Sequence, residues 1–102
     1  MRLVCFFDLP VATAANRKNY RIFRKFLIKD GYLPLQESVY VKLVVNEGAA
    51  DCAVARLRKN RPPAGLVQVL KVTETQFSTM EYITGSRRPY DEVDTMEELL
   101  VL

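Results

Sequence analysis

Hydrophobic and polar positions along the chain predict six elements of secondary structure. Residues 2–8 form a continuous apolar run that ends at an aspartate, a pattern typical of a buried strand. Residues 16–29 contain neither glycine nor proline and are followed by Asp30-Gly31, which predicts a helix and its end. The other predicted elements are two extended runs, a second helix closed by RPPAG and a last strand, over residues 32–36, 38–45, 47–60 and 66–73.

The order strand, helix, strand, strand, helix, strand indicates an α+β fold, the ferredoxin-like βαββαβ sandwich. In this arrangement an antiparallel sheet carries both helices on one face. The length of 102 residues is that of a single domain, to which we assign residues 1–85. Residues 86–102 are predicted to form a C-terminal extension whose last residues, LLVL, are a strand that adds to a sheet edge in a second copy or in a partner protein.

The first predicted strand is apolar on both sides, which predicts that both faces of the sheet are covered. Leu3, Cys5 and Phe7 point to one side, and Val4 and Phe6 point to the other. Because both helices occupy one face, another body must bury the second face. A second copy of the chain is the simplest cover, so the sequence predicts a homodimer packed partly sheet against sheet.

The net charge of +3 conceals an uneven distribution of charged residues. Residues 1–73 contain thirteen Lys and Arg against five Asp and Glu, a net +8. Residues 74–102 contain two against seven, a net −5. The basic body favours a polyanion as partner, whereas the acidic end favours protein contacts.

The predicted helix over residues 16–29 separates its cations from its apolar side chains. At about 100° per residue, one arc is aromatic and aliphatic and the other holds six cations: Arg17, Lys18, Arg21, Arg24, Lys25 and Lys29. No acid lies between Asp8 and Asp30, so no cation has a carboxylate partner within the helix. Such a face suits contacts with nucleic-acid phosphates, and the alternative is an ordinary solvated face.

A second basic group lies at the end of the other predicted helix and comprises Arg56, Arg58, Lys59 and Arg61. Cations at the C-terminus of a helix also stabilise the helix dipole. This group is therefore interpreted either as a second phosphate-binding patch or as part of the helix's own electrostatics.

The residue types present restrict the possible chemistry. Histidine is absent, which excludes histidine bases, Ser-His or Cys-His nucleophiles and histidine-ligated zinc, and there is no glycine-rich phosphate-binding loop. Cys5 and Cys52 are too few for a disulfide framework and are predicted to be buried free thiols. Without a signal peptide or a long apolar run, the sequence predicts a cytoplasmic protein with no membrane segment.

Asp8 ends the first predicted strand, within LVCFFDLP, on the same side as Val4 and Phe6. A carboxylate at the edge of a buried strand loses hydration, so a hydrogen-bond donor, a cation, a metal or a proton must compensate. The chemistry left open is that of carboxylates and divalent metals, which makes Asp8 a candidate metal ligand. The alternative is a turn or helix-capping aspartate.

Four stretches, FFDLP, RKNYRIFRKFLIKDGY, LQESVYVKLV and LKVTETQFSTMEYITG, together resemble one known family. They are similar to the small CRISPR-associated adaptation proteins, the second of the two core spacer-acquisition proteins, in their type II versions. The resemblance covers residues 1–85 and implies a ferredoxin-like homodimer that bridges two integrase dimers and holds the duplex DNA of a new spacer. It also implies Mg²⁺-dependent endonuclease (endoribonuclease) activity on single-stranded RNA or double-stranded DNA, with Asp8 as the catalytic, metal-binding residue.

Three functions follow, which we rank in this order. The first is a structural, DNA-clamping subunit of an integration complex, favoured by the basic surface and the predicted dimer. The second is a nuclease in which two Asp8 carboxylates face each other across a twofold axis and share an Mg²⁺ ion. The third is a ferredoxin-like module that binds single-stranded RNA on an open sheet face, which the dimer would occupy. The first two are compatible in one protein.

Overall fold

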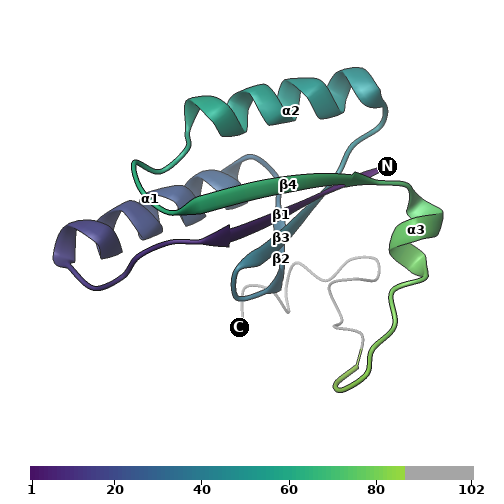
Figure 1. Cartoon of the computed structure of the whole chain (residues 1–102). Helices are drawn as coiled ribbons and strands as arrows, with labels where there is room; N and C mark the ends of the chain where they lie inside the picture. The colour runs from purple at the N-terminus through teal and green to yellow at the C-terminus, as the bar shows by residue number, and fades with distance from the viewer. Residues whose placement is uncertain (87–102) are drawn as a thin grey trace.

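The computed structural model describes residues 1–86 and contains a four-stranded antiparallel sheet with two long helices on one face (Figure 1). The strands lie in the spatial order β2-β3-β1-β4 and comprise β1 (Arg2–Asp8), β2 (Leu33–Gln36), β3 (Val39–Leu43) and β4 (Leu66–Val72). The helices are α1 (Ala14–Lys29), α2 (Glu47–Lys59) and a short α3 (Glu74–Ser78). The ferredoxin-like prediction is confirmed, and α3 is an element that the hydrophobic pattern did not predict.

The predicted C-terminal extension, with its terminal strand, lies outside the described residues except for Ser86. It therefore stays a prediction, as does the domain boundary at residue 85. No helix within residues 1–86 is long and apolar enough to cross a membrane.

The main core lies between the sheet and the two long helices. Phe7 is central to it, because its ring centre lies 5.4 Å from that of Phe23 on α1 and 5.6 Å from that of Tyr40 on β3. Small side chains on α2, Ala50 and Ala53, are fully buried and let this helix approach the sheet closely. The other buried members of the core are Leu3, Cys5, Leu27, Tyr32, Val44 and Leu57.

β3 turns its tyrosine toward the main core and its valines away from it. Tyr40 pairs with Cys5 of β1 and is 1% exposed, although it alternates with valines that are the more hydrophobic residues. Val39 and Val41 lie on the opposite face of the sheet. The reason is that Tyr40 buries its ring among the core aromatics while its hydroxyl finds a hydrogen-bond partner, Arg24.

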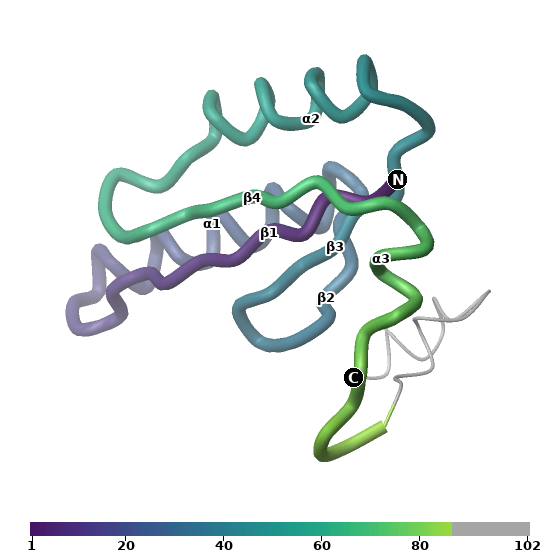
Figure 2. The backbone as a smooth tube through the Cα atoms, turned by 45° about the vertical axis from the view of Figure 1, so that its right-hand side comes forward, coloured from purple at the N-terminus to yellow at the C-terminus, as the bar shows by residue number. Residues whose placement is uncertain are grey.

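The second face of the sheet is covered in part by the chain itself. α3 follows the end of β4 beside the N-terminus (Figure 2), and its Phe77 packs against a small buried cluster of Val4, Leu35 and Val41. This corrects the expectation that another body must bury the second face, because part of it is covered by the chain's own α3. Several apolar side chains on the face nonetheless stay exposed, namely Phe6 at 37%, Leu70 at 53%, Leu66 at 55% and Leu43 at 64%.

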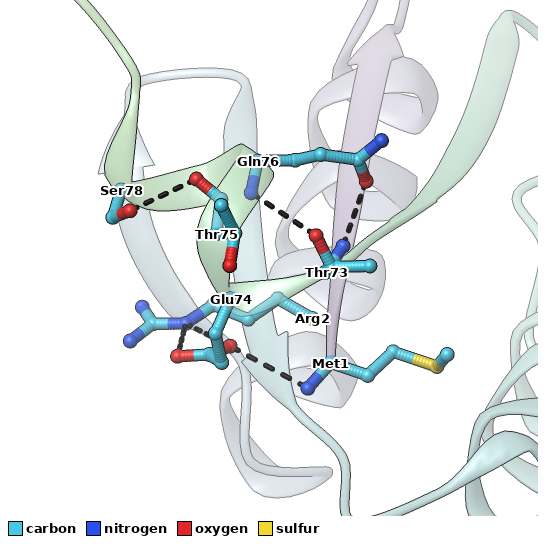
Figure 3. Close-up of polar contacts among 7 residues, drawn as sticks. All are labelled: Met1, Arg2, Thr73, Glu74, Thr75, Gln76 and Ser78. Atoms are coloured by element: carbon cyan, nitrogen blue, oxygen red, sulfur yellow. Dashed lines mark hydrogen bonds and ion pairs between the residues drawn. The ribbon is translucent and has the colours of Figure 1, made fainter.

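α3 is held on the sheet by a polar cluster at the start of β1 (Figure 3). Arg2 Nε donates to both carboxylate oxygens of Glu74, at 3.2 and 3.0 Å, and the Met1 amino group lies 3.6 Å from the same carboxylate. The Arg2 guanidinium also sits 4.2 Å from the centre of the Phe77 ring. A capping box, in which Thr73 and Gln76 exchange side-chain and backbone hydrogen bonds, begins the helix.

The pH dependence of this cluster has a definite sign. The hydrogen bond from Arg2 holds the pKa of Glu74 below its ordinary value. The ion pair therefore stabilises the fold above the usual carboxyl pKa and is lost as the pH falls through the lowered value. Glu74 is half exposed, so water weakens this contribution.

The two cysteines differ in environment. Cys5 is buried in the main core as predicted, and burial raises its pKa to about 11, which keeps the thiol protonated and unreactive at neutral pH. Cys52 lies on the exposed side of α2, so the prediction that both thiols are buried is wrong for this residue. The cause is helical phase, because Ala50 and Ala53 take the inward positions around it.

Replacing Phe77 with Ala should lower the free energy of unfolding by about 2 kcal/mol, since a half-buried ring leaves the Val4 cluster and Arg2. Urea denaturation at matched protein concentration measures the change. Thr75→Ala, on the exposed side of the same helix, is the control and should change stability by less than about 0.5 kcal/mol. Equal stability of the two variants would show that α3 contributes nothing to covering the sheet.

Candidate nucleic-acid interface

α1 is positioned by its caps and by two buried anchors. The Thr13 hydroxyl accepts a hydrogen bond from the Asn16 backbone N–H at 3.0 Å and begins the helix. The helix ends at Lys29, followed by Asp30 and by Gly31 with a φ of 96°. Because Phe23 and Leu27 fix the inward side, the predicted cations are all exposed: Arg17, Lys18, Arg21, Arg24, Lys25 and Lys29.

Within this set the cations fall into two groups. Lys18, Arg21, Lys25 and Lys29 make no hydrogen bond or ion pair with any residue in the described part of the chain. The other two are engaged, because Arg17 donates to the backbone carbonyls of Val11 and Ala12, and Arg24 donates from Nε to the Tyr40 hydroxyl. The four unengaged cations can meet phosphates without first breaking an internal contact.

The second basic group is split by the structure. Arg56 forms an ion pair with Asp30 at the end of α1, with 2.8 Å between Nε and Oδ1, and so ties the two helices together. Arg61 donates to the Arg58 backbone carbonyl. Arg56, Arg58 and Lys59 lie in the last turn of α2, where they complement its dipole. Both interpretations of this group thus have support, with Arg56 committed to the fold and Arg58 and Lys59 unengaged within residues 1–86.

The two basic groups come close to each other where α1 and α2 end. A groove of about 480 Å³ there is bordered by Lys25 and Lys29 of α1 and by Asn60, the residue that caps α2. Asp30 lies in the same groove, and one of its carboxylate oxygens forms the ion pair with Arg56. The groove therefore combines two cations of α1 with the apolar side chains of Ile22 and Phe26.

Asp8 lies at the end of β1, opposite Leu66 of β4, and is exposed. No side-chain hydrogen bond or ion pair connects it to another described residue. It does not cap α1, because Thr13 does, so the capping alternative is wrong. The expected loss of hydration is also absent in a single chain, since water reaches the carboxylate. The Asp8 carboxylate would need a cation only if another molecule covered this end of the sheet and excluded water from it.

The residues around Asp8 fit Mg²⁺ only as a weakly held ion. In the described segment, no group of three or more His, Cys, Asp or Glu is placed to hold a metal. Mg²⁺ retains several waters and commonly takes one or two carboxylates together with substrate phosphates. One exposed carboxylate meets that minimum, and the rest of the ligands must come from water, substrate or a second chain.

A further groove beside α1 was missed by sequence reasoning. It has a volume of about 340 Å³ and is lined by residues of α1, β2, β3 and the turn between the strands, namely Tyr20, Arg24, Pro34, Gln36, Glu37 and Tyr40. Helical periodicity predicts Tyr20 within the apolar arc of α1 and Arg24 within its cationic arc. Nothing in the local pattern indicates the groove, because the contact between Arg24 and Tyr40 joins two elements across the fold.

Comparison with known proteins gives a consistent result. Residues 1–80 match the family described as CRISPR associated protein Cas2. A protein of Treponema denticola named CRISPR-associated endoribonuclease Cas2 is 51% identical over 102 residues, the full length of both chains. Proteins of the same name from Streptococcus mutans and Lacticaseibacillus rhamnosus are 47% and 44% identical, over 85% and 86% of this chain and 80% and 87% of theirs.

Replacing Lys18, Arg21 and Lys25 with Ala should weaken binding to duplex DNA and flatten the plot of log affinity against log salt. Each lost phosphate contact removes about 0.9 from the slope, so the triple variant loses up to about three such increments. Fluorescence anisotropy of a labelled duplex at several salt concentrations measures this.

The matched control compares two single variants. Arg21→Ala should lower the slope, whereas Lys71→Ala should leave it unchanged, because the Lys71 ammonium already pairs with Glu47 and Asp51. An unchanged slope in Arg21→Ala and in the triple variant would mean that the cations of α1 are merely solvated.

Proposed function

The chain belongs to the CRISPR associated protein Cas2 family, and from this membership we propose that it is a nucleic-acid-binding subunit of CRISPR spacer acquisition. In this role it forms a homodimer, bridges dimers of the integrase subunit and helps to integrate duplex DNA as new spacers. The observation that supports this proposal best is the set of exposed cations on α1, of which Lys18, Arg21, Lys25 and Lys29 have no partner among residues 1–86. Phosphate contacts of this kind position a duplex and do not read its bases.

The proposed dimer uses the exposed part of the second sheet face. Phe6, Leu66 and Leu70 form a partly exposed apolar row across β1 and β4 that α3 does not cover. A second copy packed there would bury this row and bring the end of each β1 close to its counterpart. In such a dimer the second copy would cover the end of β1, and the Asp8 carboxylate would then lose contact with water.

Phe6→Glu should convert a dimer into a monomer, because it places a charge in the apolar row. Sedimentation at micromolar concentration should give twice the chain mass of 11.7 kDa for the natural protein and a single chain mass for the variant. Val45→Glu is the control, since Val45 is 87% exposed away from the strands, and it should remain dimeric. The dimer, and not the Phe6→Glu monomer, should co-purify with the integrase subunit. A natural protein that sediments as a monomer would remove the basis for bridging.

A second candidate function is Mg²⁺-dependent cleavage of RNA or DNA. It is favoured by the position of Asp8 at the exposed end of β1 and by the name endoribonuclease that the relatives carry. Asp8 is the residue that would hold the metal, and a bound Mg²⁺ would stabilise phosphate charge and activate a water. The chain's own part is to present the carboxylate at the sheet edge while α1 holds the phosphate backbone.

The third candidate, RNA binding on the open sheet face, has less support. Sheets that bind RNA in this way present aromatic side chains on which bases stack. Of the aromatic residues in β1–β4, Phe6 is the one that lies on this face, whereas Phe7 and Tyr40 are buried on the other side. Phe77 and α3 also cover part of the surface that a base would need.

The Asp8→Ala variant distinguishes the structural role in spacer integration from the nuclease activity. The variant should lose any metal-dependent cleavage of single-stranded RNA or duplex DNA, because Asp8 is the carboxylate proposed to hold the metal and the described residues contain no cluster of three or more metal-ligating side chains that could take its place. It should still dimerise, bind DNA and support spacer integration, since bridging depends on shape and on the cations of α1. Nuclease assays and an integration assay with the integrase subunit measure the two activities. A folded, DNA-binding Asp8→Ala dimer that fails in integration would make cleavage the primary function.

A further inference from the structure

The groove beside α1 has walls that the fold holds in place. Tyr40 is 1% exposed and its hydroxyl accepts a hydrogen bond from Arg24 Nε at 2.8 Å. Tyr20 is half-buried and its ring meets Phe7 edge-on, with 6.0 Å between ring centres. Pro34 stiffens the strand on the opposite side. A ligand entering the groove therefore meets aromatic and guanidinium groups that are already oriented.

Opposite charges line this groove without neutralising each other. Arg24 keeps its terminal N–H groups unengaged, because only Nε is used by Tyr40. Glu37, in the turn between β2 and β3, has no hydrogen-bond or ion-pair partner within residues 1–86. The Gln36 side-chain amide is likewise unengaged there. The groove thus presents a cationic donor group, a carboxylate acceptor and an amide around a space large enough for a small flat ligand.

A guanine base matches this set of groups. Guanine presents two adjacent acceptors, O6 and N7, which a guanidinium such as that of Arg24 contacts with two N–H groups. On its neighbouring edge it presents two adjacent donors, N1–H and N2–H₂, which a single carboxylate such as that of Glu37 accepts. Uracil has one ring N–H between two carbonyls and offers no such donor pair. Cytosine has two adjacent acceptors, N3 and O2, but no pair of adjacent donors, and adenine lacks the paired acceptors.

We propose that this groove binds an unpaired guanine base of a nucleic-acid strand whose backbone lies on α1. Tyr20 supplies an aromatic surface for the base, Arg24 and Glu37 contact its two polar edges, and Gln36 completes the polar lining. Arg21, one helical turn before Arg24, is placed for the neighbouring phosphate. This inference rests on the proposed nucleic-acid binding by α1 and adds a base preference to contacts that are otherwise independent of sequence.

The test compares two labelled single strands by fluorescence anisotropy at one fixed salt concentration. One strand is a short oligouridine and the other is the same strand with a single central guanosine. The natural protein should bind the guanosine strand about tenfold more tightly, the effect of one two-hydrogen-bond base contact. The same measurement with an oligodeoxyuridine strand, with and without a central deoxyguanosine, shows whether the base can come from DNA as well as from RNA. Preference in both sugars assigns the groove to an unpaired base of either RNA or DNA, and preference in ribose alone assigns it to RNA.

Two variants with the same change in charge test whether guanosine binds in this groove. Glu37→Gln should reduce the guanosine preference to within about twofold, because an amide cannot accept from both donors. Glu81→Gln, at an exposed position outside the groove, should keep the full preference. Both variants should bind plain oligouridine equally, since each removes one negative charge.

The results that overturn the inference differ from those that overturn the proposed function. Equal binding of both strands by the natural protein, with the normal salt dependence, would remove the guanine site and leave phosphate binding by α1 intact. A guanosine preference that persists undiminished in Glu37→Gln would place the base elsewhere and remove the site as well. Failure of either strand to bind at low salt would overturn both the site and the nucleic-acid-binding function.

Discussion

The structure depends on one constraint, the burial of apolar side chains from both faces of β1. Its neighbours are β3 and β4, and its side chains point alternately into two separate clusters. Leu3, Cys5 and Phe7 require both long helices on one side, and Val4 requires α3 on the other. The end of this strand also sets the position of Asp8. The sheet order, the sides taken by the helices and the exposed apolar row all follow from how β1 is covered.

The distribution of acids is the second organising feature, because it decides which cations are available. Four acids pair with cations that serve the fold: Asp30 with Arg56, Glu47 and Asp51 with Lys71, and Glu74 with Arg2. None of these pairs takes a cation from α1. A helix face whose charges have no internal partner retains its full attraction for phosphates, which is the physical basis of the proposed function.

Asp8 shows how a site can be incomplete in a single chain. The carboxylate is exposed and has no partner in the part of the chain described. A hydrated lone carboxylate holds Mg²⁺ weakly, and the like-charge repulsion that would favour a shared ion arises only when two copies meet. Cleavage and dimerisation are thus linked in the proposal, whereas DNA binding by α1 is a property of each chain.

The sequence by itself determined the class of fold, the six principal elements and the outward position of the α1 cations, because periodicity and the absence of acids are local properties. It also placed Asp8 at the end of a strand. Only the tertiary structure decided that α3 covers the Val4 cluster, that Cys52 is exposed and that Tyr40 faces the core. The same holds for the engagement of Arg24 by Tyr40 and of Arg56 by Asp30, since each joins residues that are distant in sequence. Such contacts arise from which elements pack together, and the spacing of residues along the chain carries no record of them.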